Sequence, residues 1–228
     1  MAGSPNHPLP DCTTLCYPRD RKYKTILLFG APGSGKGTQG KILSHIPGFF
    51  HSSTGDIFRS LDLQSEMGRI FLEYSTRGEL VPDEIVINIW KNYIKGMEMI
   101  NGFHPESEFI VLDGLPRNVR QVELLREVID VVKIIYLRAE KEKMVERLRR
   151  RAMKESRPDD ASDEVIRRRL SVFEQETRPV LDQYPQDQVI RIDATMSMIR
   201  VTSEIVNVLV PLKEALDAGR LATQSAAT

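Results

Sequence analysis

The sequence of 228 residues has few of the features that mark disulfide-rich or membrane-spanning proteins. It contains only two cysteines, Cys12 and Cys16, which with the nearby His7 cannot form a disulfide framework or a four-ligand zinc site. Its apolar runs, such as residues 26–29, are far shorter than the roughly 20 residues of a membrane span, and the N-terminus has no apolar signal segment. We therefore expect a soluble protein of the reducing cytoplasm, with no membrane partner.

Charge of one sign is not in excess either, because Lys plus Arg and Asp plus Glu each number 32. A net charge near zero gives no whole-chain field that attracts nucleic acid, so we expect no nucleic-acid partner and only a local basic site. The content of 41% hydrophobic and 28% charged residues is typical of a globular domain.

Short apolar runs alternate with longer amphipathic stretches after about residue 24. Continuous apolar runs predict strands that are buried on both faces. Helical spacing appears in Val122, Leu125 and Ile129, and in other stretches between the runs. The alternation predicts an α/β fold, in which helices cover both faces of a parallel sheet. The predicted strands are residues 25–29, 49–51, 109–112, 131–137 and 189–192.

The two ends of the chain differ from the rest in composition. Residues 1–23 are rich in Pro, Asp and small polar residues without periodicity, so we expect a disordered extension. A cloning remnant or a partner-binding segment would have the same composition. We expect residues 213–228 to form a C-terminal tail, which becomes a run of small residues from Ala218.

The first predicted strand leads directly into the segment Gly30-Ala-Pro-Gly-Ser-Gly-Lys-Gly-Thr38. Its spacing of two glycines before a lysine is that of a phosphate-binding loop. Glycines allow backbone N–H groups to point inward around an anion, and the lysine reaches the β- and γ-phosphates. The predicted ATP-binding residues are Gly33, Ser34, Gly35, Lys36, Gly37 and Thr38. Because Gly37 replaces the usual Ser or Thr, the sequence does not predict a direct hydroxyl ligand to magnesium.

The overlapping segment from Gly35 to Gly40 also has the alternating glycines of a dinucleotide-binding loop. That loop should begin directly after the strand, whereas this segment begins five residues later and contains a lysine, so we reject the match.

The predicted strand 109–112 ends at Asp113, the place where phosphate-loop enzymes carry the acid that positions magnesium. We interpret Asp113 as that residue.

Arginines are concentrated between Arg147 and Arg169. Phosphoryl transfer requires several negative charges to be offset, and the planar guanidinium group matches phosphate oxygens. Helical periodicity over residues 140–153 and 163–175 separates two groups. Those beside the buried stripe, and so expected at the rim of a cleft, are Arg147, Arg151 and Arg169; those expected on the surface are Arg149, Arg150 and Arg168.

No catalytic base stands out. His7, His45, His51 and His104 are scattered and have no evident acid or nucleophile partner. An acceptor that is already an anionic phosphate needs no base.

Five motifs in order resemble the adenylate kinases of the nucleoside monophosphate kinase family, over residues 24–212. They are the phosphate loop, Ser53-Thr-Gly-Asp-Ile-Phe-Arg59, Gly78-Glu-Leu-Val-Pro-Asp-Glu84, Asp113-Gly-Leu-Pro-Arg117 with Gln121, and Arg157-Pro-Asp-Asp160. The resemblance implies a phosphate-loop three-layer sandwich with a five-stranded parallel sheet, a helical monophosphate-binding insert near residues 54–88 and a short lid near 151–160. It also implies the reaction ATP plus AMP to two ADP with Mg²⁺. We expect a monomer.

The resemblance also implies roles for individual residues. The catalytic set is Lys36, Arg117, Arg147, Arg151, Arg157 and Arg169. Arg147 would also stack on the ATP adenine, and Asp113 would hold Mg²⁺, through water. The AMP-binding set is Thr54, Arg59, Glu79, Leu80, Val81, Gly114, Arg117, Gln121, Arg157 and Arg169. Only five residues separate Arg151 from Arg157, so no zinc-binding lid insertion is expected.

Substrate choice is implied at two positions, because Thr54 and Gln121 accompany adenine in this family, whereas pyrimidine-selecting relatives usually carry Ala and Asn. A kinase for UMP, CMP or another monophosphate and a non-catalytic nucleotide sensor are the alternatives. The chain departs from the family pattern at Leu115, where Phe is frequent. It is also one residue short after Arg59 and one residue long between Asp160 and Arg169. The helical periodicity supports the assignment of Arg169.

Overall fold

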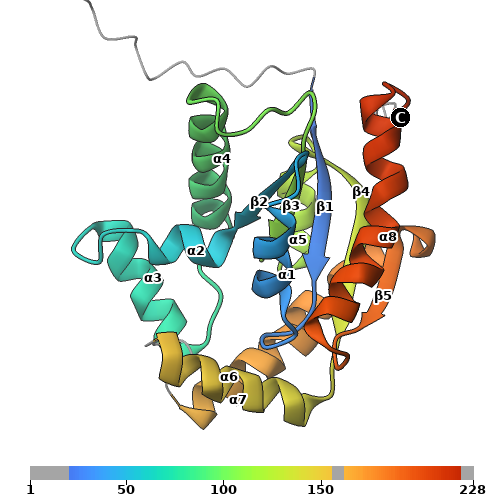
Figure 1. The fold of residues 1–228 in the computed structure, drawn as a ribbon. Helices are drawn as coiled ribbons and strands as arrows, with labels where there is room; N and C mark the ends of the chain where they lie inside the picture. Colours follow the sequence, from blue (N-terminus) through green and yellow to red (C-terminus); the bar gives the residue numbers. More distant parts are fainter. Residues whose placement is uncertain (1–20, 156–161, 222–228) are drawn as a thin grey trace, which may run out of the picture.

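The computed structural model describes residues 21–155 and 162–221 of the chain. Its centre is a five-stranded sheet with the order β2-β3-β1-β4-β5, in which all neighbouring strands are parallel (Figure 1). This confirms the predicted fold class. The strands are β1 (Tyr23–Phe29), β2 (Phe49–Ser53), β3 (Phe109–Asp113), β4 (Ile129–Arg138) and β5 (Val189–Asp193).

The strand order places a crevice at the carboxyl end of β1. The chain passes from β1 to β2 on one side and later crosses to β4 on the other, so connections diverge around this strand. In open parallel sheets, ligands bind at such a switch point. Leu28 of β1 lies in register with Asp113 of β3, so the phosphate loop and the acid leave the same edge of the sheet.

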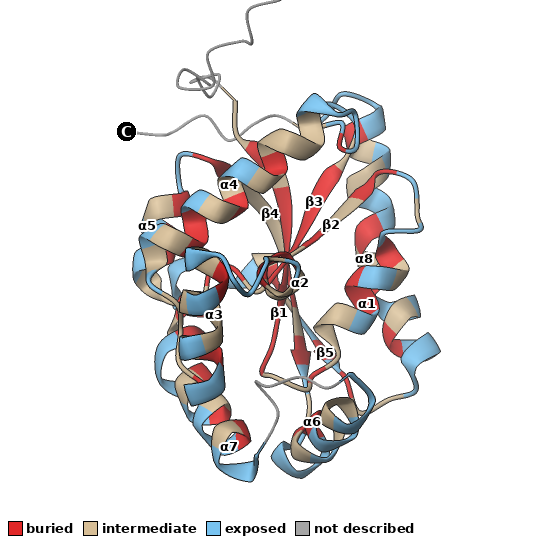
Figure 2. Cartoon of the chain, turned by 90° about the vertical axis from the view of Figure 1, so that its left-hand side faces the viewer, coloured by how far each residue is buried: buried red, intermediate tan, exposed pale blue. Residues whose placement is uncertain are grey.

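Helices cover both faces of the sheet (Figure 2). Side chains alternate along β1: Ile26 and Leu28 pack in one core with residues of α1 and α8, whereas Leu27 and Phe29 pack in the other with residues of α4, α5, α6 and α7. This period of two explains why the strands are continuously apolar. The helices are α1 (Lys36–Leu43), α2 (Thr54–Arg59), α3 (Glu66–Arg77), α4 (Asp83–Met99), α5 (Val119–Leu125), α6 (Lys141–Glu155), α7 (Asp163–Val172) and α8 (Met198–Asp217).

Local sequence determines where the short helices begin. The hydroxyl groups of Ser53 and Ser65 accept hydrogen bonds from backbone N–H groups in the first turns of α2 and α3, and Asn118 and Ser162 do the same for α5 and α7. Helix α3 ends at Gly78, whose φ of 70° requires the left-handed conformation. Among the described residues, no helix combines the length and the apolar character needed to cross a membrane.

Several predicted boundaries were wrong. Tyr23 is not part of the N-terminal extension but begins β1, where its hydroxyl donates to Glu98 at 2.8 Å. Ile129 does not continue the helix of Val122 but begins β4, because two short buried elements meet there.

Helix boundaries differ from the predicted ranges as well. Helix α8 runs to Asp217, past the predicted tail boundary at 212, and α4 runs to Met99, past the expected end of the insert. Helix α7 ends at Val172 and passes into a π-helical turn, η3 (Phe173–Thr177), followed by the 3₁₀ segments η4 (Arg178–Gln183) and η5 (Gln186–Gln188). Helix α6 includes the first residues of the expected lid up to Glu155, and the next six lie outside the described residues.

Two helical glycines should respond in opposite ways to replacement by alanine. A Cβ at Gly68 in α3 would lie 2.1 Å from the backbone oxygen of Asp62, whereas a Cβ at Gly96 in α4 would meet nothing within 4 Å. We expect Gly68→Ala to lower the free energy of unfolding by about 1–3 kcal/mol, and Gly96→Ala to raise it by about 0.5–1 kcal/mol. Urea denaturation measures both, and a shift of the two variants in the same direction would contradict the packing described.

Candidate active site

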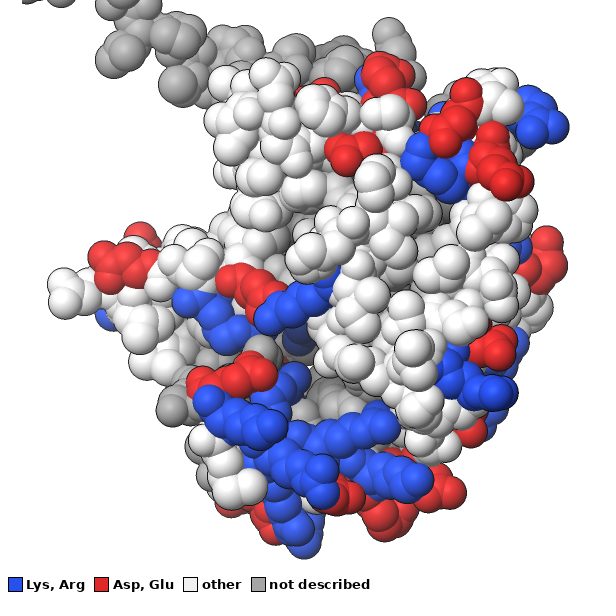
Figure 3. Space-filling view, viewed as in Figure 1, with Lys and Arg blue, Asp and Glu red and all other residues white. Residues whose placement is uncertain are grey.

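A cleft of about 820 Å³ opens at the carboxyl end of the central strands. Its walls are the segment after β1, the helices between β2 and α4, the residues after β3, and α6 and α7. Figure 3 shows this hollow between the insert and the lower helices, bordered by Lys and Arg side chains. A local basic site therefore exists in a chain of zero net charge.

The phosphate loop depends on its glycines. Gly30, Gly33 and Gly35 have φ values of 144°, 83° and 102°, a range that glycine adopts without strain. A Cβ at Gly33 would also lie 2.6 Å from the backbone oxygen of Met144 in α6. Helix α1 has no side-chain cap at Gly35, unlike the four helices with Ser or Asn caps, so the N–H groups of its first turn are left for an anion.

Lys36 is the first residue of α1, and its Nζ donates to the backbone oxygens of Gly30 at 2.6 Å and Ala31 at 3.2 Å. The pKa of its amine is lowered to about 8, chiefly by burial. Asp113 opposes this shift, and the nearby cations Arg117, Arg151 and Arg169 contribute to it. Three arginines, one from the segment after β3, one from α6 and one from α7, are thus close enough to act on one lysine. A bound anion would relieve the repulsion between these cations.

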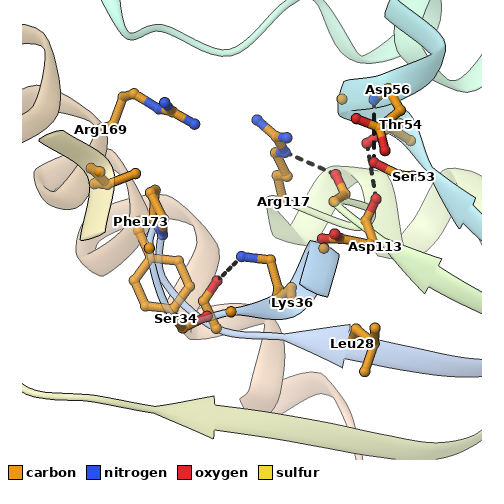
Figure 4. A pocket seen from close by; sticks show the side chains of 18 of the residues that line it. Leu28, Ser34, Lys36, Ser53, Thr54, Asp56, Asp113, Arg117, Arg169 and Phe173 are labelled. Atoms are coloured by element: carbon orange, nitrogen blue, oxygen red, sulfur yellow. Dashed lines mark hydrogen bonds between the residues drawn. The ribbon is translucent and has the colours of Figure 1, made fainter. Parts of the chain in front are cut away.

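Asp113 ends β3 and is largely buried. A Cβ at Gly37 would lie 3.7 Å from its Oδ2, so its carboxylate faces the start of α1 (Figure 4). Thr38, the hydroxyl residue that directly follows Gly37, is exposed. Within residues 21–155 and 162–221, no group of three or more His, Cys, Asp or Glu could hold a metal ion. Asp113 is therefore a carboxylate beside the loop and not part of such a group.

The other side of the cleft is formed around Gly114, which has a φ of 95°. A Cβ there would lie 2.4 Å from Oγ1 of Thr54 and 3.2 Å from Nη2 of Arg117, so only glycine lets these side chains approach. Nε of Arg117 donates to the Gly114 oxygen at 2.8 Å, and Thr54 Oγ1 donates to the Asp113 oxygen at 3.2 Å. Nη2 of Arg59 donates to Asp56 Oδ1 at 2.6 Å.

The guanidinium groups of Arg117 and Arg169 point towards one another above the amine of Lys36 (Figure 4). Arg147, Arg151 and Arg169 are half-buried and line the cleft, as the helical periodicity predicts. Arg149, Arg150 and Arg168 are exposed, which is also as predicted. The expected arginine Arg157 lies outside the described residues.

Other predicted residues lie where the sequence places them, although their roles stay predictions. Each of the following lines the cleft: Gly33, Ser34, Gly35, Gly37, Thr38, Thr54, Arg59, Glu79, Leu80, Val81, Gly114 and Gln121. Arg147 joins two of the walls, because its Nη2 donates to the Ala194 oxygen at 2.8 Å and its Nη1 lies 3.5 Å from the Gly33 oxygen.

Sequence reasoning missed some residues of the cleft. Two of the predicted surface arginines do more than face solvent: Arg150 lines the cleft, and Arg168 in α7 forms an ion pair with Glu79, just after α3. The segment after β5 contributes Ala194, Met196 and Met198. The segment after β5 could have been predicted, because it follows the end of a buried parallel strand. The pair of Arg168 and Glu79 could not, because the two residues are 89 positions apart and no local pattern links them.

Comparison with known proteins agrees with this geometry. The family model described as adenylate kinase matches residues 28–189. A protein named adenylate kinase from Cyanothece sp. is 36% identical over 195 residues, which cover 82% of this chain and 96% of the relative. A protein named adenylate kinase from Kocuria rhizophila is 36% identical over 192 residues, which cover 81% of this chain and 97% of the relative. One from Parabacteroides distasonis is 34% identical over 165 residues, which cover 70% and 83%. The chain that forms this arginine-lined cleft therefore belongs to the adenylate kinase family of nucleoside monophosphate kinases.

Proposed function

We propose that the cleft binds ATP and AMP with their phosphates facing each other and transfers the γ-phosphoryl group directly from ATP to AMP, which gives two molecules of ADP. The observation that carries this proposal is the convergence of Lys36, Arg117, Arg151 and Arg169 on one region of the cleft. Binding of ATP alone would not need a second group of cations on the opposite wall.

The two walls suggest where each nucleotide binds. The ATP phosphates would lie on the phosphate loop and Lys36, with the adenine against Arg147 and the segment from Ala194 to Met198. The AMP phosphate would be held by Arg59 and Arg117, and its adenine would lie among Thr54, Leu80, Val81 and Gln121, with Glu79 and Gly114 completing the wall. Arg151 and Arg169 would act between the two nucleotides, joined by Arg157.

This arrangement suits transfer without a covalent intermediate. The attacking group is a phosphate oxygen that is already anionic, so the protein needs no general base. Its contribution is to hold both phosphates in line and to stabilise the charge on the transferred group. The ion pair between Glu79 and Arg168 joins the insert to α7 beside the cleft and would help to exclude water from the transfer.

Mg²⁺ is the metal that the family generally uses with ATP. The donor set fits it, because Mg²⁺ keeps several waters and is bound by one or two carboxylates together with substrate phosphates. Asp113 would hold the ion through water, whereas Gly37 offers no hydroxyl. Bound to the phosphates, Mg²⁺ would neutralise part of their charge. We propose that the protein has no structural zinc site, because only five residues separate Arg151 from Arg157.

We further propose that the chain acts as a monomer in the cytoplasm and on nucleotides rather than nucleic acid or membranes. The support against a polyanionic partner is the net charge of zero, which gives no whole-chain field. The molar mass from light scattering would check the monomer.

Arg117→Ala should reduce kcat/KM for AMP by about a hundredfold or more, because a charged donor at the reacting phosphates is lost. Arg120→Ala, in the first turn of the following helix α5, exposed and paired with Glu84, should change it by less than about threefold. A coupled assay of ADP formation measures both. Equal losses in the two variants would contradict a direct role of Arg117 at the reacting phosphates.

Among AMP, GMP, CMP and UMP, AMP should be preferred as acceptor by about a hundredfold or more, because a site built to form hydrogen bonds strongly rejects a base that leaves them unmade. The measurement is kcat/KM for each monophosphate at a fixed ATP concentration. Better turnover of another monophosphate would replace the substrate assignment. Tight binding of ATP with no turnover of any acceptor would favour a nucleotide sensor.

ATP affinity should fall as pH rises through about 8, the pKa of Lys36 in the free protein. The charged amine is needed for phosphate binding, and bound phosphate raises its pKa, so the affinity should drop by about tenfold per pH unit above that value. Calorimetry between pH 7.5 and 10 tests this, in a range where the ATP phosphates are already fully ionised.

Lys36→Arg is the control, because its guanidinium stays charged over the whole range. It should bind ATP more weakly but with a nearly flat pH profile. An equally flat profile in the unaltered protein would contradict the role of the lysine charge.

A further inference from the structure

The side-chain amide of Gln121 has a hydrogen-bond partner at both its oxygen and its nitrogen. It lies in the first turn of α5 and is 1% exposed, yet it lines the wall where the AMP base is proposed to bind. Its Oε1 accepts from the backbone N–H of Arg117 at 2.6 Å, and its Nε2 donates to Asp83 Oδ1 at 2.7 Å. Asp83 belongs to α4, so one amide is held from two separate elements.

These two partners allow only one orientation of the amide. A backbone N–H can only donate, and an ionised carboxylate can only accept. A 180° rotation of the Gln121 amide would put two donors together at Arg117 and two acceptors together at Asp83. Each contact, left unmade in a buried place, costs free energy.

A neighbouring side chain fixes Asp83 in turn. Nδ2 of Asn118 donates to the same Asp83 Oδ1 at 2.9 Å, and Oδ1 of Asn118 accepts from the Gln121 backbone N–H at 2.8 Å. The carboxylate thus accepts from two side-chain amides, and neither amide can turn without losing a hydrogen bond.

One N–H and one lone pair of the Gln121 amide remain for a ligand. Because the amide cannot rotate, the positions of this donor and this acceptor cannot be exchanged. Adenine presents an amino donor at position 6 beside a ring-nitrogen acceptor, and guanine presents an oxygen acceptor at that position. Hypoxanthine also has an oxygen there, beside a protonated N1. A freely turning amide could match either base, but a fixed amide matches only one order.

We propose that Asp83 is a specificity-determining positioning residue, which selects 6-aminopurine over 6-oxopurine monophosphates by fixing the orientation of the Gln121 amide. This rests on the proposed function, because it assumes that the acceptor base lies against Gln121. Asp83 does not touch the substrate. It acts through Gln121, so the selectivity for the acceptor base depends on the contact between α4 and α5.

The test compares Asp83→Asn with Glu84→Gln. An Asn amide can present either a donor or an acceptor to Gln121, so one of the two constraints on the amide is removed. The control removes the next carboxylate of the same helical turn, which pairs with Arg120 across the same two helices and does not contact Gln121. Both variants lose one acidic charge from the N-terminus of α4, so any effect of the helix dipole is matched.

The readout is the ratio of kcat/KM for AMP to kcat/KM for IMP, whose bases differ only at position 6 and in the N1 proton. We expect Asp83→Asn to lower this ratio by about tenfold, the size of one buried unmet hydrogen bond, through a rise in turnover of IMP. Glu84→Gln should leave the ratio within about twofold. A loss of general order in the site would lower both values together and would not raise that for IMP.

An unchanged ratio in Asp83→Asn, or equal losses with AMP and IMP, overturns the proposal. Asp83→Ser is a second variant with the same expectation, because a hydroxyl both donates and accepts and is favoured in the first turn of a helix. Calorimetric affinities for AMP and IMP provide a separate readout. If the unaltered protein forms no ADP from ATP and AMP, the proposed function fails, and the shift in AMP-over-IMP binding between Asp83→Asn and Glu84→Gln still decides the role of Asp83.

Discussion

The structure is organised around the repulsion between a buried lysine amine and the positive charges of three arginines. Among the described residues, the carboxylate that opposes this repulsion is Asp113. Such a cluster is unfavourable by itself, since desolvation and like charges both oppose the charged amine. The rest of the fold supplies the rigidity that keeps it together. Two backbone oxygens at the end of β1 accept from the amine, and the sheet that carries them is buried on both faces. A phosphate ligand would replace this repulsion by attraction, which makes the site selective for highly charged substrates.

The close approach of backbone in the cleft depends on a few glycines. Gly33 lets the phosphate loop pack on the backbone of α6, Gly114 lets Thr54 and Arg117 meet, and Gly78 lets the end of α3 lie against Arg169 in α7. In these three cases a Cβ would lie 2.6, 2.4 and 3.1 Å from its nearest neighbour, respectively. These contacts join the phosphate loop to α6, the start of α2 to the segment after β3, and the end of α3 to α7. The same glycines therefore position the backbone and the charged side chains of the cleft.

The sequence predicts the parts of this site that are encoded locally. Buried runs identify the five strands, and a period of 3.6 residues separates half-buried Arg147, Arg151 and Arg169 from exposed Arg149 and Arg168, because both signals arise within one element. It does not predict the contact of Arg168 with Glu79, or that of Gln121 with Asp83, since these join separate elements. The end of α7 was also missed, because its apolar spacing continues through the π-helical turn η3.

The acidic residues of the cleft explain how a strongly basic site can exist in a chain of zero net charge without being neutralised. Asp56 pairs with the lining residue Arg59 and Glu79 pairs with exposed Arg168, whereas Asp83, which does not line the cleft, holds Gln121. Among the residues that the structure describes, Asp113 is the acid that raises the pKa of the Lys36 amine. These acids are tied to particular partners, and Arg117, Arg151 and Arg169 all act on the amine of Lys36. Equal numbers of acids and bases are therefore compatible with a strong local field, provided that the acids act as orienting groups and the bases converge.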